Sequence, residues 1–174
     1  YSPNSFTLTK GTAMTTVTPT VSGGTVTSWS VSPSLPAGLS LDSSTGALSG
    51  TPTAISTNTT YTITARNTAG ANSTTITIVI VDEVPTIAYS PENLTLTKGL
   101  TSTDLPLTPT LTGSGAITSW AINATLPAGL NFGTSNGTIW GISTVLQTSP
   151  ITYTIWANNS GGSSSATINI TIID

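Results

Sequence analysis

The residues able to perform acid–base or nucleophilic chemistry are few in this chain. Its 174 residues include six Asp or Glu and three Lys or Arg, and there is neither His nor Cys. Catalysis near neutral pH usually needs a base whose pKa can be tuned to that range, and His and Cys supply one most readily. A Ser–Lys or carboxylate pair is still open, but no nucleophile elbow or other catalytic motif is present. We therefore predict a protein that is not an enzyme and holds no cofactor.

Metal binding is limited by the same scarcity of ligands. Without Cys there is neither a disulfide framework nor a thiolate site. Calcium takes about six to eight oxygen ligands, several of them carboxylates. Asp82 and Glu83 are adjacent, and Glu92 and Asp104 are the nearest further candidates. We expect these side chains to be solvated and predict no metal site, with calcium at Asp82 and Glu83 as the alternative.

The composition narrows the classes of partner. Ser and Thr account for 63 of the 174 residues, and the net charge is −3 with Lys10, Arg66 and Lys98 as the only basic side chains. So few cations predict no binding to nucleic acid or to an anionic membrane. No run of about 20 apolar residues is present, so we expect no membrane insertion by this segment. Hydrophobic residues make up 36% of the chain, which favours a folded protein over a disordered one.

Internal repetition is the strongest signal in the sequence. Short motifs return with a shift that grows from 88 to 92 positions, as expected when two copies of one domain differ by small loop insertions. The first copy spans 1–82 and the second 89–174, and the Pro-containing segment 83–88 is predicted to be a short linker. The matching motifs are YSP at Tyr1 and Tyr89, TLTKG at Thr7 and Thr95, TSW at Thr27 and Thr118, LPAGL at Leu35 and Leu126, and YTI at Tyr61 and Tyr153.

Alternation of apolar and polar residues predicts strands throughout both copies. Tyr61, Ile63 and Ala65 alternate with Thr62 and Thr64, which is the period of a strand with one buried face. About seven such segments per copy are separated by turn signals, and no helical periodicity is present. The fold class is therefore all-β, with two tandem immunoglobulin-like sandwiches of about seven strands each.

Two motifs link the chain to a known family. The string LPAGLSLDSSTGALSGTPT is followed by YTITARNTAG and TTITIVIV, and the second copy has LPAGLNFGTSNGTIWG and YTIWANNSGG. This order resembles the "putative Ig" repeat, a cadherin-like or dystroglycan-type immunoglobulin fold found in large bacterial and archaeal surface proteins. The resemblance implies an immunoglobulin-like fold and an extracellular or cell-surface location, and it implies almost nothing about biochemical activity.

The repeat also predicts which tryptophans are buried. Trp29 and Trp120 occupy matching positions and are expected at the centre of each core, with Leu35, Leu39 and Leu48 packed around the first of them.

Trp140 and Trp156 are the interface or ligand candidates. They align with Ser49 and Thr64, whose alternation points away from the core. An outward indole can contact another protein, stack on a sugar ring or cover the domain's own surface. A protein contact is our first expectation.

Seven of the eleven Asn residues begin an N-x-S/T sequon, against about four expected from the Ser and Thr content. The excess is modest, so N-glycosylation is one open alternative. The candidate positions are Asn58, Asn72, Asn93, Asn123, Asn136, Asn158 and Asn169.

The function that these observations favour is a structural unit of a head-to-tail surface filament or array. The segment Val84–Ala88 forms a strand-like lead-in to the second copy, and the first copy begins at Tyr1 without one. An unpaired sheet edge invites strand addition, so the expected partners are copies of the same chain, joined by strand addition or end-to-end contact. The alternative function is an adhesin stalk or carbohydrate-binding module, with surface glycans as ligands.

Overall fold

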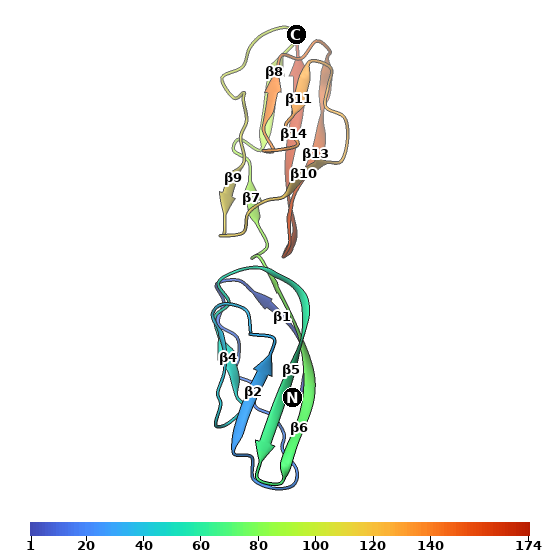
Figure 1. Cartoon of the computed structure of the whole chain (residues 1–174). Coiled ribbons are helices and arrows are strands. Elements are labelled where there is room, and N and C mark those ends of the chain that lie inside the picture. The colour runs from blue at the N-terminus through green and yellow to red at the C-terminus, as the bar shows by residue number, and fades with distance from the viewer. The chain divides into compact units, whose positions relative to one another are not determined.

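The structure is a computed structural model that describes all residues from Tyr1 to Asp174. It contains strands and no helix, and its contacts divide the chain into two compact units, Tyr1–Asp82 and Glu83–Asp174 (Figure 1). The prediction of an all-β protein made of tandem immunoglobulin-like sandwiches is confirmed. We call the two units repeat 1 and repeat 2.

Repeat 1 contains six strands, which are β1 (Ser5–Thr9), β2 (Ser28–Ser32), β3 (Leu39–Leu41), β4 (Leu48–Gly50), β5 (Ser56–Asn67) and β6 (Gly70–Val81). The main sheet has the order β1-β6-β5-β2, with β1 parallel to β6 and the other pairs antiparallel. The hairpin β3-β4 forms a second, two-stranded sheet, and Val17 joins Leu48 through an isolated bridge.

Repeat 2 contains eight strands, which are β7 (Thr86–Ala88), β8 (Asn93–Thr97), β9 (Thr110–Thr112), β10 (Ser119–Ile122), β11 (Leu130–Phe132), β12 (Ile139–Gly141), β13 (Gln147–Asn159) and β14 (Gly162–Ile173). Its main sheet, β10-β13-β14-β8, repeats the order seen in repeat 1, and β11-β12 corresponds to β3-β4. The pair β7-β9 is additional, so the two repeats have six and eight strands rather than about seven each. Segment 83–88, expected as a linker, therefore supplies a strand to repeat 2.

The cores follow the alternation of the long strands. In β5, Tyr61 and Ile63 are buried while Thr62 between them is exposed. Each strand of the main sheet thus buries one face against the smaller strands and turns hydroxyl side chains outward, as a sandwich requires. The fully buried aliphatic side chains include Ile76, Ile78 and Ile80 in repeat 1 and Ile168, Ile170 and Ile172 in repeat 2.

The LPAGL motif is explained by a close approach of two backbone segments. The Leu39 amide donates to the Pro36 carbonyl, and the Thr51 amide donates to the Gly38 carbonyl at 2.9 Å. Gly38 has φ +91°, and a Cβ there would lie 1.9 Å from the Thr51 carbonyl oxygen. Glycine is required because any side chain would collide with backbone.

The two central tryptophans occupy equivalent sites but differ in burial. A Cβ on Gly46 would collide with the Trp29 ring, and a Cβ on Gly137 would collide with the Trp120 ring in the same way. Trp120 is 7% exposed, as predicted, whereas Trp29 is half-buried and packs at the margin of its core. The prediction of equal burial is therefore wrong for Trp29.

Candidate interaction surfaces

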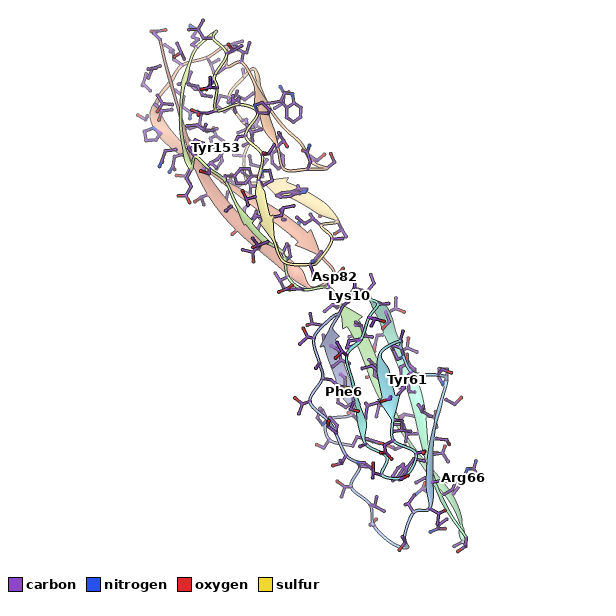
Figure 2. The ribbon with its side chains drawn as sticks, turned by 90° about the vertical axis from the view of Figure 1, so that its left-hand side faces the viewer. Phe6, Lys10, Tyr61, Arg66, Asp82 and Tyr153 are labelled. Carbon is purple, nitrogen blue, oxygen red and sulfur yellow. The ribbon has the colours of Figure 1, made fainter.

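The ionisable side chains near the middle of the chain are engaged within their own repeats. Lys10 Nζ lies 3.7 Å from Asp82 Oδ1 at the end of repeat 1, where Figure 2 labels both residues. The Asp82 side chain is largely buried there, while Lys10 remains exposed at 45%. In repeat 2, the Glu83 carboxylate accepts hydrogen bonds from the amide and hydroxyl of Ser114, both at 3.2 Å. The calcium candidates Asp82 and Glu83 thus have protein partners in separate units, and no group of three or more acidic side chains converges on a common point.

Asp42 is an acidic residue whose role is local. Its Oδ1 accepts hydrogen bonds from the amides of Ser44 at 2.7 Å and Thr45 at 2.9 Å. These bonds, that from Thr45 first, lower the pKa of the Asp42 carboxyl below its ordinary value. The side chain shapes the turn between β3 and β4, which is a structural task.

Trp140 lies on β12 in the small sheet of repeat 2 and is 43% exposed. It borders a shallow hollow of about 530 Å³ together with Leu105, Pro106 and Asn136. An apolar floor with an indole and an amide at its edge is the kind of surface that a protein or a sugar ring can contact.

Trp156 lies on β13 in the main sheet, between Ala121 of β10 and Ser165 of β14. It alternates with Ile155 and Ala157, which are fully buried, so its side chain is on the outer face. Small neighbours leave the indole half-buried against its own sheet. Trp140 and Trp156 therefore belong to different sheets and do not form one platform.

The sequon residues lie on the surfaces of both repeats. Asn158 and Asn169 are half-buried and their side-chain amides donate hydrogen bonds, Asn158 to the Ser119 hydroxyl at 3.2 Å and Asn169 to the Asn93 side chain at 2.8 Å. Glycan attachment at either amide nitrogen would replace these bonds. The exposed sequon residues are Asn58, Asn72, Asn93, Asn123 and Asn136.

The pairing of β7 with β9 is the most specific feature of the candidate surfaces of repeat 2. β7 pairs antiparallel with β9, placing Ile87 opposite Leu111, and Ile87 is buried at 7% exposure within the core cluster. The side-chain amide of Asn159 donates to the Glu83 carbonyl at 2.6 Å, which holds the segment before β7. We call Glu83–Ala88 the lead-in.

The corresponding surface of repeat 1 borders a groove of about 470 Å³. Its walls include Val21, Trp29, Ile63, Ala65 and Asn67. Ala65 is half-buried, although its counterpart Ala157 is completely buried in repeat 2. The segment Thr20–Ser22, which matches β9, forms no strand.

Sequence reasoning identified the lead-in of repeat 2 but did not identify the residues that receive it. The hairpin asparagines Asn67 and Asn159 could have been found, because both occupy the same position after the YTI motif. Val21 and Leu111 match in the same way, within the motifs TPTV and TPTL. Neither pair carries a chemical signal that distinguishes it from an ordinary turn or loop.

Comparison with known proteins defines the family. The model of the family "Putative Ig domain" matches residues 1–81 and 84–173, and the chain belongs to this family. The resemblance inferred from the LPAGL and YTI motifs is confirmed. The protein is thus a tandem of immunoglobulin-like domains.

Curated relatives include a serine-rich adhesin for platelets from Staphylococcus aureus strain MRSA252. It is 33% identical over 143 residues, which cover 76% of this chain and 10% of the adhesin. The same adhesin from strain MSSA476 matches with 33% identity over 6% of its length. The chain therefore spans a tenth or less of the length of these relatives.

Several solved structures are similar in fold at modest scores. The Dscam isoform structure aligns over 98% of this chain and 43% of its own, with 13% identity and a TM-score of 0.47. Titin domains Z1Z2 align over 97% of this chain and 92% of their own, with 17% identity and a TM-score of 0.45. A Bacteroides fragilis chain described as an α-galactosidase aligns over 45% of this chain and 16% of its own, with 33% identity and a TM-score of 0.40. The structure itself contains no helix long and apolar enough to cross a membrane.

Proposed function

We propose that this chain is a non-enzymatic structural module of an extracellular or cell-surface protein, and that it forms part of a head-to-tail filament or array. Membership of the "Putative Ig domain" family and the likeness to a stretch of a staphylococcal adhesin support a surface role. The scarcity of charge suits it too, because three Lys or Arg residues leave few sites for trypsin-like proteases.

The observation that carries this proposal is how repeat 1 leads into repeat 2. Residues 82–85 alone separate β6 from β7, and β7 belongs to the sandwich of repeat 2. The segment that leaves one repeat is used as a strand by the next. A head-to-tail contact between the end of one chain and the start of another continues as a fibre when its rotation does not close into a ring.

The test is the size and shape of purified 1–174 under native conditions. Light scattering across a range of concentrations and electron microscopy of the same samples should show end-to-end assemblies whose length rises with concentration. A monomer that persists at high concentration would contradict self-assembly of this chain. Trp29→Ala, which alters the groove, and Trp156→Ala, on the outer sheet face, form a matched pair for locating the contact.

The second candidate is an adhesin stalk or carbohydrate-binding module, and the exposure of Trp140 beside the hollow favours it. A glycan array probed with the whole chain tests this function. Binding that is lost in Trp140→Ala or Trp156→Ala would support it, and an array without reproducible signal would argue against it.

A further inference from the structure

We propose that Asn136 carries an N-linked glycan whose first sugar ring stacks on Trp140 in the hollow of repeat 2. The inference rests on the proposed function for its extracellular setting alone, because sequons are modified on exported proteins. It does not depend on assembly into a filament. It goes further than the proposed function by selecting one of the seven sequons and naming the surface that its sugar covers.

Asn136 lies at the exposed turn between β11 and β12. Its Oδ1 accepts a hydrogen bond from the Thr138 amide at 3.1 Å, which restrains the orientation of the side-chain amide. The Asn136 Nδ2, the atom to which a glycan is joined, makes no hydrogen bond within the protein. In Asn158 and Asn169 the same atom donates to a neighbouring residue. Attachment at Asn136 therefore breaks no protein contact and keeps the turn.

The indole of Trp140 lies beside this amide. A Cβ on Gly133 would collide with Asn136 Oδ1 and would lie 3.3 Å from Trp140 Cζ3, so the two side chains flank the same point. Both line the hollow of about 530 Å³, and Trp140 is 43% exposed. A sugar ring joined to Nδ2 begins one bond away from the amide, so it is within reach of the indole.

The other walls of the hollow suit a neutral sugar. Its lining holds no ionisable side chain. A pyranose has C–H groups on its faces and hydroxyls around its rim, so it matches an aromatic ring with hydroxyl groups nearby. Leu105 and Pro106 add to the apolar part of the lining, and the hydroxyl groups come from Thr101, Ser102 and Thr138.

The turn itself does not require asparagine. Thr45 has the matching position in repeat 1, and its hydroxyl accepts a hydrogen bond from the Ala47 amide at 3.2 Å. A shorter side chain thus makes the turn contact that Asn136 makes in repeat 2. The turn accounts for a side-chain oxygen at this position, and it does not account for an amide beside an exposed indole.

The sequon, the indole and the space between them occur together in repeat 2. Repeat 1 has Asp42 at the position of Gly133 and Ser49 at the position of Trp140. A side chain at Gly133 would fill the space between the amide and the indole, because its Cβ would already meet Asn136. These nearby positions therefore differ from repeat 1 in the way that a stacked sugar requires.

The modification is a group transfer from a lipid-linked sugar donor. The bond from Asn136 Nδ2 to C1 of the first sugar forms as the bond from C1 to the diphosphate oxygen of a polyprenyl diphosphate oligosaccharide breaks. One proton leaves the amide nitrogen, and the polyprenyl diphosphate leaves with the electron pair of the broken bond. Thr138 supplies the hydroxyl at the third position of the sequon.

The experiment is production of the whole chain in a eukaryotic secretory host, followed by hydroxyl-radical labelling and mass spectrometry of its peptides. Asn136 and Trp140 lie on one short peptide, so each molecule reports its glycan and the oxidation of its indole together. We expect Asn136 to be occupied. Oxidation of Trp140 in occupied peptides should fall to about half or less of that in unoccupied ones, because a stacked ring covers one face of the indole.

Two variants separate attachment from stacking, and each introduces the residue that repeat 1 has at the matching position, so both should fold. Thr138→Ala removes the sequon and should return Trp140 to the oxidation of the unglycosylated chain, while Trp156 should react equally in both. Trp140→Ser should leave Asn136 occupied. Glycosylation should raise the unfolding temperature of repeat 2 by about 4 °C more in the native chain than in Trp140→Ser, with unglycosylated chains from bacterial cells as references.

The outcomes separate this inference from the proposed function. Asn136 unoccupied while other sequons carry glycans overturns the site, and so does an occupied Asn136 with equal oxidation of Trp140. In the first case, protection of Trp140 by an added free oligosaccharide would assign the hollow to an external glycan instead. A monomeric chain with an occupied Asn136 and a protected Trp140 supports the inference and contradicts only the filament.

Discussion

The two repeats share a sheet order and differ in how completely their cores are covered. Seven buried hydrophobic side chains form the core cluster of repeat 1, and fifteen form that of repeat 2. Three of the differences border the groove, since Tyr1, Trp29 and Ala65 are half-buried where Tyr89, Trp120 and Ala157 are buried. Leu8, Leu35 and Leu39 are also less buried than their counterparts, and they do not line the groove.

In repeat 2, the three-residue strand β7 pairs only with β9 and still places a side chain, Ile87, in the core. Ile87 and Tyr89, the tyrosine that follows the lead-in, are both buried in the core cluster of repeat 2. Tyr89 Oη donates to the Gly137 carbonyl at 2.6 Å, and Tyr1 Oη donates to the Gly46 carbonyl at 2.5 Å. The tyrosine anchor is therefore present in both repeats.

The largest expected effect concerns the central tryptophans. Trp120→Ala should destabilise repeat 2 by about 3–5 kcal/mol, as for other large-to-small core substitutions, and Trp29→Ala should cost clearly less because its ring is already half-exposed. Calorimetric unfolding of the whole chain measures both. Trp156→Ala is the control and should cost little, since that indole lies on the outer sheet face. Equal losses for Trp120 and Trp29 would contradict the proposed difference between the cores.

Ile87→Ala should convert repeat 2 into a state that resembles repeat 1. Removing this buried side chain should cost about 2–4 kcal/mol, including the cavity that it leaves. The Trp120 fluorescence should shift towards that of a half-exposed indole, measured in a variant that lacks the other tryptophans. Leu111→Ala, on the exposed side of the same strand pair, is the matched control with a small expected cost. An unchanged Trp120 environment in Ile87→Ala would show that β7 does not cover the ring.

The hairpin asparagines provide a smaller and more selective test. Asn67→Ala removes one turn hydrogen bond, from the Ala69 amide. Asn159→Ala removes two turn bonds, from the Gly161 and Gly162 amides, and also the bond to the Glu83 carbonyl. The loss should therefore be greater for Asn159→Ala by about 1–3 kcal/mol, at about 1 kcal/mol for each additional hydrogen bond. Urea unfolding of both variants measures the difference. Identical losses would mean that the hydrogen bond to the Glu83 carbonyl adds nothing to the free energy of unfolding of repeat 2.

The smallest expected effect is a difference in acid sensitivity. Backbone hydrogen bonds from Thr45 and Ser44 lower the pKa of Asp42 below its ordinary value of 3.8, while the matching position in repeat 2 is Gly133. The contribution of Asp42 is present above pH 3.8 and is lost as the pH falls through the lowered pKa of the folded state. The unfolding temperature of repeat 1 should fall in this range, and Asp42→Asn should flatten that dependence because the amide oxygen still accepts the turn bonds. An unaltered acid profile in Asp42→Asn would exclude this carboxyl as the cause.

Much of the fold could be predicted because its determinants are local. The alternation around Tyr61 and Ile63, the turn glycines and the LPAGL motif specify strands and turns through neighbouring residues alone, and the repetition of motifs reveals two domains. The outward direction of Trp140 and Trp156 followed from the same alternation. The degree of burial did not, because it depends on which side chains of other strands lie beside each indole.

The amino-acid sequence alone specifies the set of strands, their inner and outer faces and the existence of two homologous units. The coverage of each position depends on the tertiary structure, since Trp29 and Trp120 have the same local sequence, TSW, and different burial. The physical reason is that burial is a non-local property. Ile87 belongs to a core whose other members run from Tyr89 to Ile172, and no local pattern reports how far a side chain from another strand covers each position.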